Sequence, residues 1–443
     1  MTSPFYLHKR FHLSRITDFL IITLGTITQL CFFLAHEKAI TILFVIGSLL
    51  FLSCIFCFNE RNVFLFFIFL VPNQRIITIT NIDISLLNII IFSFLFFKLA
   101  SFQSINLSNH RFFLWSLPFV YAMSLFMHIG SLTNVFVAIK STALIILLWY
   151  FVSDVRKEID FENLSTFFIL GCIVAALISL FFGTLNEGQR FDAGEQNNPN
   201  IFGGVISFSL ACVSVLFLSG KWKATKAMPF SFLLIFIGLL TQSRSFMLSL
   251  VIIITFSCIH LLAHHDGRKK SYNLIVGILI LTCLLIFSQA PYVNEALNSV
   301  LLRIAEPRRG DISGMRLFIW ATYTEYLLTN VDVMIFGTTP QLAMNYTGLD
   351  FVAHNGFLET IISWGILGFS VIMISLLYAV NQIYRLKKAR GFYPLGVAGL
   401  LPLVILFVAN MTGHGILSIG FITQLFLGSL ALCVQNGLTE SFE

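Results

Sequence analysis

Charged residues are scarce in this chain of 443 residues, where Asp, Glu, Lys and Arg together make up only 11%. Soluble domains carry roughly a quarter of their residues as charged side chains, so this balance excludes an ordinary cytosolic enzyme. The hydrophobic share is 57% and the mean hydropathy is +0.89. Aromatic residues make up 15% of the chain, and 49 of them are phenylalanine, which excludes intrinsic disorder.

Motifs for nucleotide and metal chemistry are also missing. The sequence has no Walker loop and no H-E-x-x-H, and no cluster of carboxylates on the predicted outer side resembles a divalent-metal site. Cys54 and Cys57 have the C-x-x-C spacing, but they lie in the apolar run FLSCIFCF without a second pair or a nearby His. They are interpreted as small packing residues. We therefore predict no cofactor and no metal.

Long apolar runs fill most of the chain. A helix needs about 20 apolar residues to cross a bilayer, and about fourteen runs qualify or come close. No stretch of about ten residues alternates strictly, so a transmembrane barrel is excluded and helices are expected. The run near 63–72 is short and ends at Pro72, which reduces the expected number to about 12–14. The predicted fold class is an all-α polytopic membrane protein, with residues 1–443 forming one transmembrane domain. The runs lie near 16–35, 39–58, 63–72, 85–100, 112–130, 134–153, 165–184, 201–219, 228–241, 246–263, 273–289, 356–380, 394–410 and 415–435.

The two ends of the chain are predicted to be cytoplasmic. The run from Ile16 to Ala35 is too long for a signal peptide and lacks a small-residue cleavage site, so it is expected to stay as an anchor. Lys and Arg concentrate in cytoplasmic loops, and the densest basic clusters, at 221–226, 267–270 and 384–390, all fall on the side of the N-terminus. The net charge of +6 therefore reflects topology and does not indicate nucleic-acid binding.

The same orientation places three polar features outside: the loop 185–200, the break TQSRS at 241–245 and the segment 290–355. The last, at about 66 residues, far exceeds a normal helix connection, and loops of that length are usually functional. Apolar residues recur at helical spacing from Val293 to Ile304 and from Leu317 to Leu328. This pattern predicts two helices lying at the outer membrane surface.

Arginines on the outer side are candidate ligands for an anion, because that side should be poor in basic residues. The guanidinium presents a fork of donors that suits phosphate oxygens. An anionic ligand is predicted for Arg190, Arg244 and Arg316. Pairing with nearby carboxylates is the alternative, and it is the simpler interpretation for Arg308 and Arg309. The candidates for diphosphate or glycan binding in the long loop are Arg303, Arg308, Arg309 and Arg316.

Two further residues could carry chemistry. Lys140 lies about two turns into an apolar span, where an ionisable group needs a partner or water; a stem that reaches the outer interface is an equally good account. His354 lies at the end of the long loop, where its imidazole could accept a proton from a sugar hydroxyl. Asn355 and Glu359 are candidate glycan ligands beside it, and a helix-capping His/Asn pair is the alternative.

Four stretches together resemble the O-antigen polymerase and ligase superfamily of bacterial membrane glycosyltransferases. Their order, spacing and membrane placement match, and they cover about 180 residues of the C-terminal half. They define a polymerase/ligase-like core at 185–435, including the loop 290–355. The stretches are Arg190 followed by NNPNIFGG at 197–204, QSRS at 242–245, RGDISGMRLFIW at 309–320 with FG at 336–337, and HNGFLETIISWGILG at 354–368.

The resemblance implies a C-type glycosyltransferase of the bacterial inner membrane with a periplasmic, metal-independent site. The implied donor is a glycan linked to undecaprenyl diphosphate, and a chain-length regulator is a candidate protein partner. Arg190, Arg244 and His354 match the family's arginines and its H-N histidine, and they are the expected catalytic residues. In the implied mechanism the arginines stabilise the leaving diphosphate and His354 orients or deprotonates the acceptor hydroxyl. The surface helices would exclude water.

Polymerase and ligase differ in the acceptor, which is another lipid-linked repeat unit for the polymerase and the lipid A core for the ligase. The DISGMR-type loop and Ser245, where ligases commonly have Gly, favour the polymerase. A lipid-glycan flippase or transporter is the alternative from a different class. Transporters favour broken helices and polar residues near the bilayer midplane. This chain instead concentrates its polar residues on one face and in one long loop.

Overall fold

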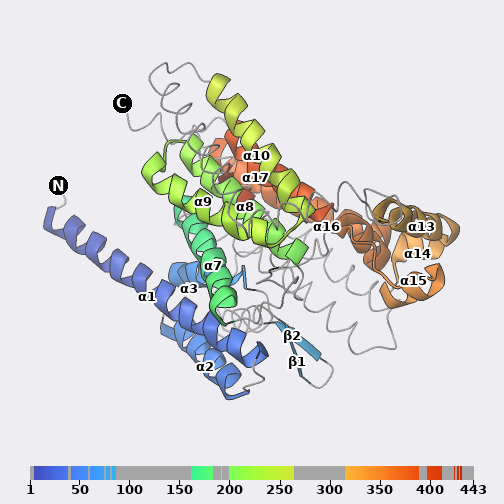
Figure 1. The fold of residues 1–443 in the computed structure, drawn as a ribbon, viewed down its shortest axis with the longest axis horizontal. Coiled ribbons are helices and arrows are strands. Elements are labelled where there is room, and N and C mark those ends of the chain that lie inside the picture. Colours follow the sequence, from blue (N-terminus) through green and yellow to red (C-terminus); the bar gives the residue numbers. More distant parts are fainter. Residues whose placement is uncertain are drawn as a thin grey trace.

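The structure is a computed structural model that places long helices in one body with a small helical cap (Figure 1). It describes residues 4–37, 41–57, 60–73, 76–79, 82–85, 161–182, 191, 199–263, 315–338, 340–388 and 397–411, together with positions 424, 427, 428, 430 and 431. The predicted spans at 112–130, 134–153 and 273–289, nearly all of the span at 85–100 and the predicted surface helix at 293–304 lie outside these residues.

Four described helices are long and apolar enough to cross a membrane. They are the apolar part of α1 (Pro4–Glu37), α7 (Phe161–Phe182), α8 (Pro199–Leu218) and the first part of α16 (Gly356–Lys388). The prediction of apolar, membrane-type helices is confirmed at this level. Five shorter apolar helices accompany them: α2 (Thr41–Cys57), α3 (Glu60–Leu70), α9 (Ala224–Leu240), α10 (Arg244–Ala263) and α17 (Val397–Asn410).

A short hairpin is an addition to the predicted helices. Strands β1 (Ile76–Ile79) and β2 (Ile82–Ser85) pair antiparallel, with Ile76 opposite Ser85 and Ile79 opposite Ile82. The sequence IITITNIDIS does alternate between isoleucine and polar residues, which is the strand period of two. Each strand has only four residues, so the helical class is unchanged.

One continuous apolar core joins the N-terminal and C-terminal helices. Helix α8 lies at its centre, against α7, α9, α10 and α17, and α3 is enclosed by α1 and α7 (Figure 1). Edge-to-face packing of Phe168 and Phe208, with ring centroids 5.6 Å apart, holds α7 against α8. Because buried residues from Ile21 to Ala431 belong to this single cluster, these helices form one body.

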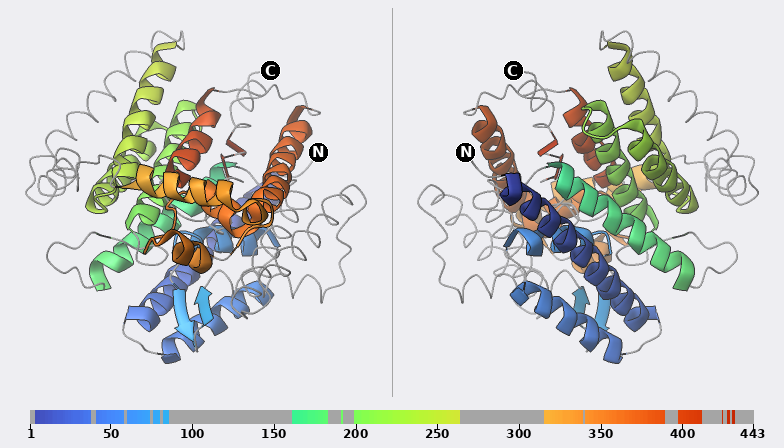
Figure 2. Two further views of the ribbon diagram at one scale, coloured as in Figure 1. Left: turned by 90° about the vertical axis from the view of Figure 1, so that its right-hand side faces the viewer. Right: turned by 90° about the vertical axis from the view of Figure 1, so that its left-hand side faces the viewer.

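Three helices form a cap at one end of this body, at the amino end of α16 (Figures 1 and 2). They are α13 (Arg316–Thr329), α14 (Val331–Phe336) and α15 (Pro340–Thr347). A second apolar cluster, which includes Ile319, Tyr323, Ala343 and Ile362, packs the cap on the first turns of α16. Helix α13 confirms the helix expected at 317–328, whereas α14 and α15 were not predicted.

Helices α10 and α16 run in the same general direction, and their carboxyl ends lie at the same end of the molecule in both views of Figure 2. The basic clusters at 267–270 and 384–390 directly follow or overlap those ends. A third basic cluster joins α8 to α9. There Trp222 donates a hydrogen bond of 3.1 Å to Glu162 of α7, and the Lys226 ammonium lies 4.0 Å from the centre of the Trp222 ring.

Candidate functional site

The turn between α9 and α10 presents Arg244 as the first residue of α10. Ser243 caps this helix, because its hydroxyl accepts a hydrogen bond of 3.4 Å from the Phe246 N–H and its carbonyl one of 3.1 Å from the Met247 N–H. The Ser243 and Ser245 hydroxyls lie 2.8 Å apart. Ser245 therefore takes part in the hydrogen bonds of the turn.

Helix α8 packs directly on this turn. Pro199 occupies the first helical position, which suits a residue that lacks an N–H. Gly203, one turn later, faces Ser243 so closely that an added Cβ would lie 2.8 Å from the Ser243 Cβ. The glycine thus allows the NPNIFGG stretch and the QSRS turn to touch.

Phe191 is the described residue next to Arg190 in the sequence, and Arg190 itself lies outside the described residues. The Phe191 N–H donates a hydrogen bond of 3.2 Å to the Leu240 carbonyl, at the carboxyl end of α9. Its buried ring packs edge-to-face on Phe202 of α8, with centroids 6.0 Å apart. The chain next to Arg190 is therefore anchored beside the turn that carries Arg244.

Arg316, the first residue of α13, lies close enough to Arg244 for the two charges to repel each other. Burial lowers the pKa of Arg316 from its usual value, and the positive charge of Arg244 lowers it further. Both side chains are half-buried. Two neighbouring guanidinium groups that are partly shielded from water favour the binding of an anion.

The loop before α16 holds His354 in the left-handed backbone region, with φ of 51°. Its N–H donates a hydrogen bond of 2.9 Å to Glu359 Oε1. The Asn355 side chain accepts hydrogen bonds from the Phe357 and Leu358 N–H groups, at 3.0 and 3.2 Å. Asn355 is thus the N-cap of α16, and the capping role that was the alternative interpretation is present.

Helix α13 ties the His354 loop to Arg316. The Trp320 indole N–H donates a hydrogen bond of 2.9 Å to the Ala353 carbonyl, and the Tyr323 hydroxyl donates one of 2.8 Å to the Phe351 carbonyl. Both bonds come from the helix that begins at Arg316, so the cap connects the arginine pair to the His354 loop.

Positive φ angles mark the same three places. Among the described residues, the non-glycine residues with positive φ are Gln242, Met315 and His354. Gln242 lies two residues before Arg244, and Met315 immediately precedes Arg316. Such conformations cost about 1–3 kcal/mol each and collect at functional sites. These positive φ angles could not be predicted from residue type, because none of the three residues is a glycine.

Helix α16 is broken at Gly365, where φ is 64° and ψ is 176°. The Thr338 N–H donates a hydrogen bond of 2.6 Å to the Ile362 carbonyl, and a Cβ on Gly337 would lie 2.6 Å from the Gly365 nitrogen. Close backbone contact at two glycines therefore joins the FG pair at 336–337 to the SWGILG stretch. The two stretches are far apart in the sequence and meet only in the fold.

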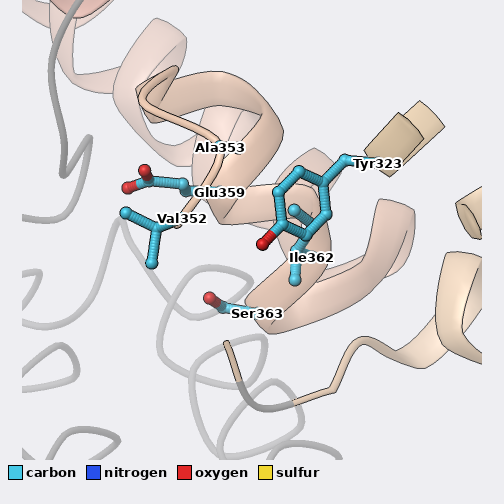
Figure 3. A pocket seen from close by; sticks show the side chains of 6 residues that line it. All are labelled: Tyr323, Val352, Ala353, Glu359, Ile362 and Ser363. Atoms are coloured by element: carbon cyan, nitrogen blue, oxygen red, sulfur yellow. The ribbon is translucent and has the colours of Figure 1, made fainter. Parts of the chain in front are cut away.

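A small cavity of about 60 Å³ opens beside the His354 loop (Figure 3). Three side chains of its wall, Val352, Ala353 and Ile362, are apolar, and the remaining lining residues are Tyr323, Glu359 and Ser363. Burial raises the pKa of Tyr323, the Thr347 hydroxyl lowers it, and the negative charge of Glu359 raises it further. Tyr323 therefore stays a neutral phenol.

The structure places Arg244 close enough to Arg316 for their charges to interact, and hydrogen bonds connect His354, Asn355 and Glu359. The candidates Arg190, Arg303, Arg308, Arg309 and Lys140 lie outside the described residues. Tyr323 and Trp320 were missed, because an aromatic residue in an amphipathic helix has the same pattern as a packing residue. Within the described part of the chain, no group of three His, Cys, Asp or Glu could hold a metal ion.

No protein-family model matches this chain, and no curated protein is similar enough to it to count as a relative.

Proposed function

We propose that this chain is an O-antigen polymerase of the bacterial inner membrane, with about 12–14 transmembrane helices and its site on the periplasmic side. It transfers a glycan from undecaprenyl diphosphate to a sugar hydroxyl of another lipid-linked repeat unit. The observation that carries the proposal is the convergence of Arg244, Arg316 and His354. Arg244 begins α10, Arg316 begins α13 and His354 precedes α16. The cap links these places, and a positive φ angle lies at or just before each of the three residues.

The arginine pair suits the donor's diphosphate. Arg244 and Arg316 repel each other in the free protein, and an anion between them would remove that cost. In the transfer step the acceptor oxygen bonds to the anomeric carbon while the bond from that carbon to the phosphate oxygen breaks. The lipid diphosphate leaves with the electron pair. Two fixed guanidinium groups stabilise the charge that this leaving group gains.

His354 suits the acceptor side. Its backbone is fixed by the bond to Glu359 and by the cap on Asn355, so the imidazole is carried on a rigid loop. A neutral imidazole accepts the proton of the acceptor hydroxyl as that oxygen bonds to the anomeric carbon. The cap over the loop limits the access of water, which would otherwise hydrolyse the donor.

A lipid-glycan flippase or transporter is the second candidate, and the break in α16 is the observation that favours it. Transporter sites are commonly built at discontinuous membrane helices. Gly365 interrupts an apolar helix inside the range that is long enough to span a bilayer. A polymerase forms a new glycosidic bond and a transporter does not, so the two are separable by their products.

The test uses the purified full-length protein with undecaprenyl-diphosphate-linked oligosaccharide as the only substrate. We expect longer lipid-linked glycans from the unaltered protein and a loss of at least about a hundredfold in rate for Arg244→Ala and His354→Ala. Lys221→Ala, which removes an exposed basic residue of the cluster at 221–226, is the matched control and should retain the rate. Absence of any new glycosidic bond with folded protein would contradict the proposal.

Gel analysis of lipopolysaccharide from a deletion strain separates polymerase from ligase. Loss of a polymerase leaves core capped with a single repeat unit, whereas loss of a ligase leaves bare core. Bare core in that experiment would assign the chain to the ligase.

A further inference from the structure

The cavity beside the His354 loop differs in charge from the arginine pair, because its lining includes an acidic residue and no basic one. Its wall carries the carboxylate of Glu359, which also accepts the His354 N–H. The hydroxyls of Tyr323 and Ser363 are directed toward the same space between α13 and α16 (Figure 3). The Tyr323 proton is donated to the Phe351 carbonyl, so the phenol oxygen offers lone pairs to the cavity. A phosphate or a sugar acid is disfavoured there, and a neutral hydrogen-bond donor is favoured.

The size and the wall restrict the ligand further. One water molecule needs roughly 10–15 Å³ of such space, so about 60 Å³ admits a group of a few heavy atoms. Val352, Ala353 and Ile362 present methyl groups to this space. A hydroxyl would bury poorly against them, whereas a methyl group would gain from the contact.

We infer that this cavity holds the acetamido group of an N-acetylated acceptor sugar. The inference rests on the proposed function, which places the acceptor at the His354 loop. The acetamido methyl packs on Val352, Ala353 and Ile362, and the amide N–H donates to the acceptor atoms of the cavity. The amide carbonyl faces the open side, where water satisfies it. The donor diphosphate and the acceptor sugar thus bind at separate places, each in a region of suitable charge.

A binding measurement tests this without requiring turnover. The probes are the methyl glycosides of N-acetylglucosamine and N-acetylgalactosamine, compared with those of glucose and galactose. They are titrated by saturation-transfer NMR into the full-length protein, in a detergent without a sugar headgroup. We expect the better acetamido glycoside to bind roughly tenfold or more tightly than its hydroxyl counterpart, as for a small apolar group that fills a fitted pocket.

Two variants fill the cavity. Ala353→Leu adds bulk from the buried wall, and Val352→Phe adds it from the half-buried rim, so the test does not depend on one variant that fails to fold. Both should bring the affinity ratio of acetamido to hydroxyl glycosides close to one. Val331→Phe makes the same change as Val352→Phe at an exposed position of α14 and is the matched control, with an unchanged ratio.

Binding of inorganic diphosphate to the same samples separates the two proposals. An affinity ratio near one in the unaltered protein, or a ratio that both cavity-filling variants leave unchanged, overturns this inference while the diphosphate result upholds the proposed function. A preserved acetamido preference without diphosphate binding or glycan synthesis overturns the proposed function and leaves a sugar-binding cavity.

Discussion

The Thr338 N–H donates a hydrogen bond of 2.6 Å to the carbonyl oxygen of Ile362. In an uninterrupted helix that carbonyl would accept from the residue four positions later, Ile366. The cap therefore supplies the partner that the break at Gly365 removes from α16. This exchange makes the position of the cap and the conformation of α16 depend on each other.

Gly365→Ala should destabilise the protein strongly. The backbone at Gly365, with φ of 64° and ψ of 176°, lies in a region almost confined to glycine, which costs an alanine about 1–3 kcal/mol. Its Cβ would also overlap the Ile335 backbone, which adds about 1–3 kcal/mol. Gly348→Ala is the matched control, because φ at Gly348 is +66° but nothing lies within 4 Å of an added Cβ. The measurement is the midpoint of thermal unfolding in detergent. Equal decreases for the two variants would show that the contact of Gly365 with α14 is unimportant.

Two variants of Asn355 distinguish a helix-capping role from a glycan-binding role. Asn355→Ala should lower the free energy of unfolding by about 1 kcal/mol, because the Phe357 and Leu358 N–H groups lose their acceptor. Asn355→Asp keeps an oxygen at the cap and adds a favourable charge at the helix amino end, so it should retain stability. Full glycan synthesis by Asn355→Asp would assign the residue to capping, whereas stable but inactive protein would assign it to the substrate.

Glu359 should act on His354 through the backbone. Glu359→Ala leaves the partly buried His354 N–H without its carboxylate acceptor, at a cost of about 1–3 kcal/mol, and it should slow glycan synthesis. Glu359→Gln retains an oxygen that can accept the same bond, so it should recover most of the rate. The rates and the pH profiles of both variants are compared with those of the unaltered protein. A rate for Glu359→Gln as low as that for Glu359→Ala would show that the charge, and not the bond, is required.

The arginine pair should show opposite effects on stability and binding. Arg316→Gln removes a partly buried charge and its repulsion by Arg244. The midpoint of thermal unfolding of the ligand-free protein should therefore rise. Its affinity for inorganic diphosphate should fall at least about tenfold, and the affinity of the unaltered protein should weaken as salt concentration increases.

A double-mutant cycle with Arg244→Gln completes this test. Because both arginines contact one anion in the proposal, the losses of the single variants should not add in the double variant. Losses that add fully would place the two side chains at independent sites.

The apolar helices could be predicted because composition alone specifies them. The spans expected near 165–184 and 201–219 correspond to α7 and α8 within a few residues. Hydrophobic run length depends on the bilayer and not on distant contacts, so no tertiary information was needed. Arg244 and Arg316 were singled out for a similar reason, since a basic residue in a loop that is predicted to lie outside is unusual wherever the helices pack.

The geometry of the site could not be predicted in the same way. The positive φ of His354 and the bond from Thr338 to Ile362 depend on residues that meet only after the cap has folded. Asn355 is equally suited to capping a helix and to binding a sugar, so its residue type did not separate the two roles. The hairpin at 76–85 was missed because four residues per strand give a weak alternation beside long helical runs.

Gln29, in the first membrane helix, has a consequence for how the chain is made. It is fully buried, and its amide donates to the carbonyls of Phe69 in α3 and Gly171 in α7, at 3.0 and 3.4 Å. The second partner lies 142 residues further along the chain. During synthesis α1 enters the membrane with a polar amide that has neither partner, and it gains both only when α7 has been inserted. The interhelical hydrogen bonds of α1 are thus completed only after α7 is made. Truncations that end before α7 should therefore leave α1 less tightly packed and more readily cleaved by membrane proteases.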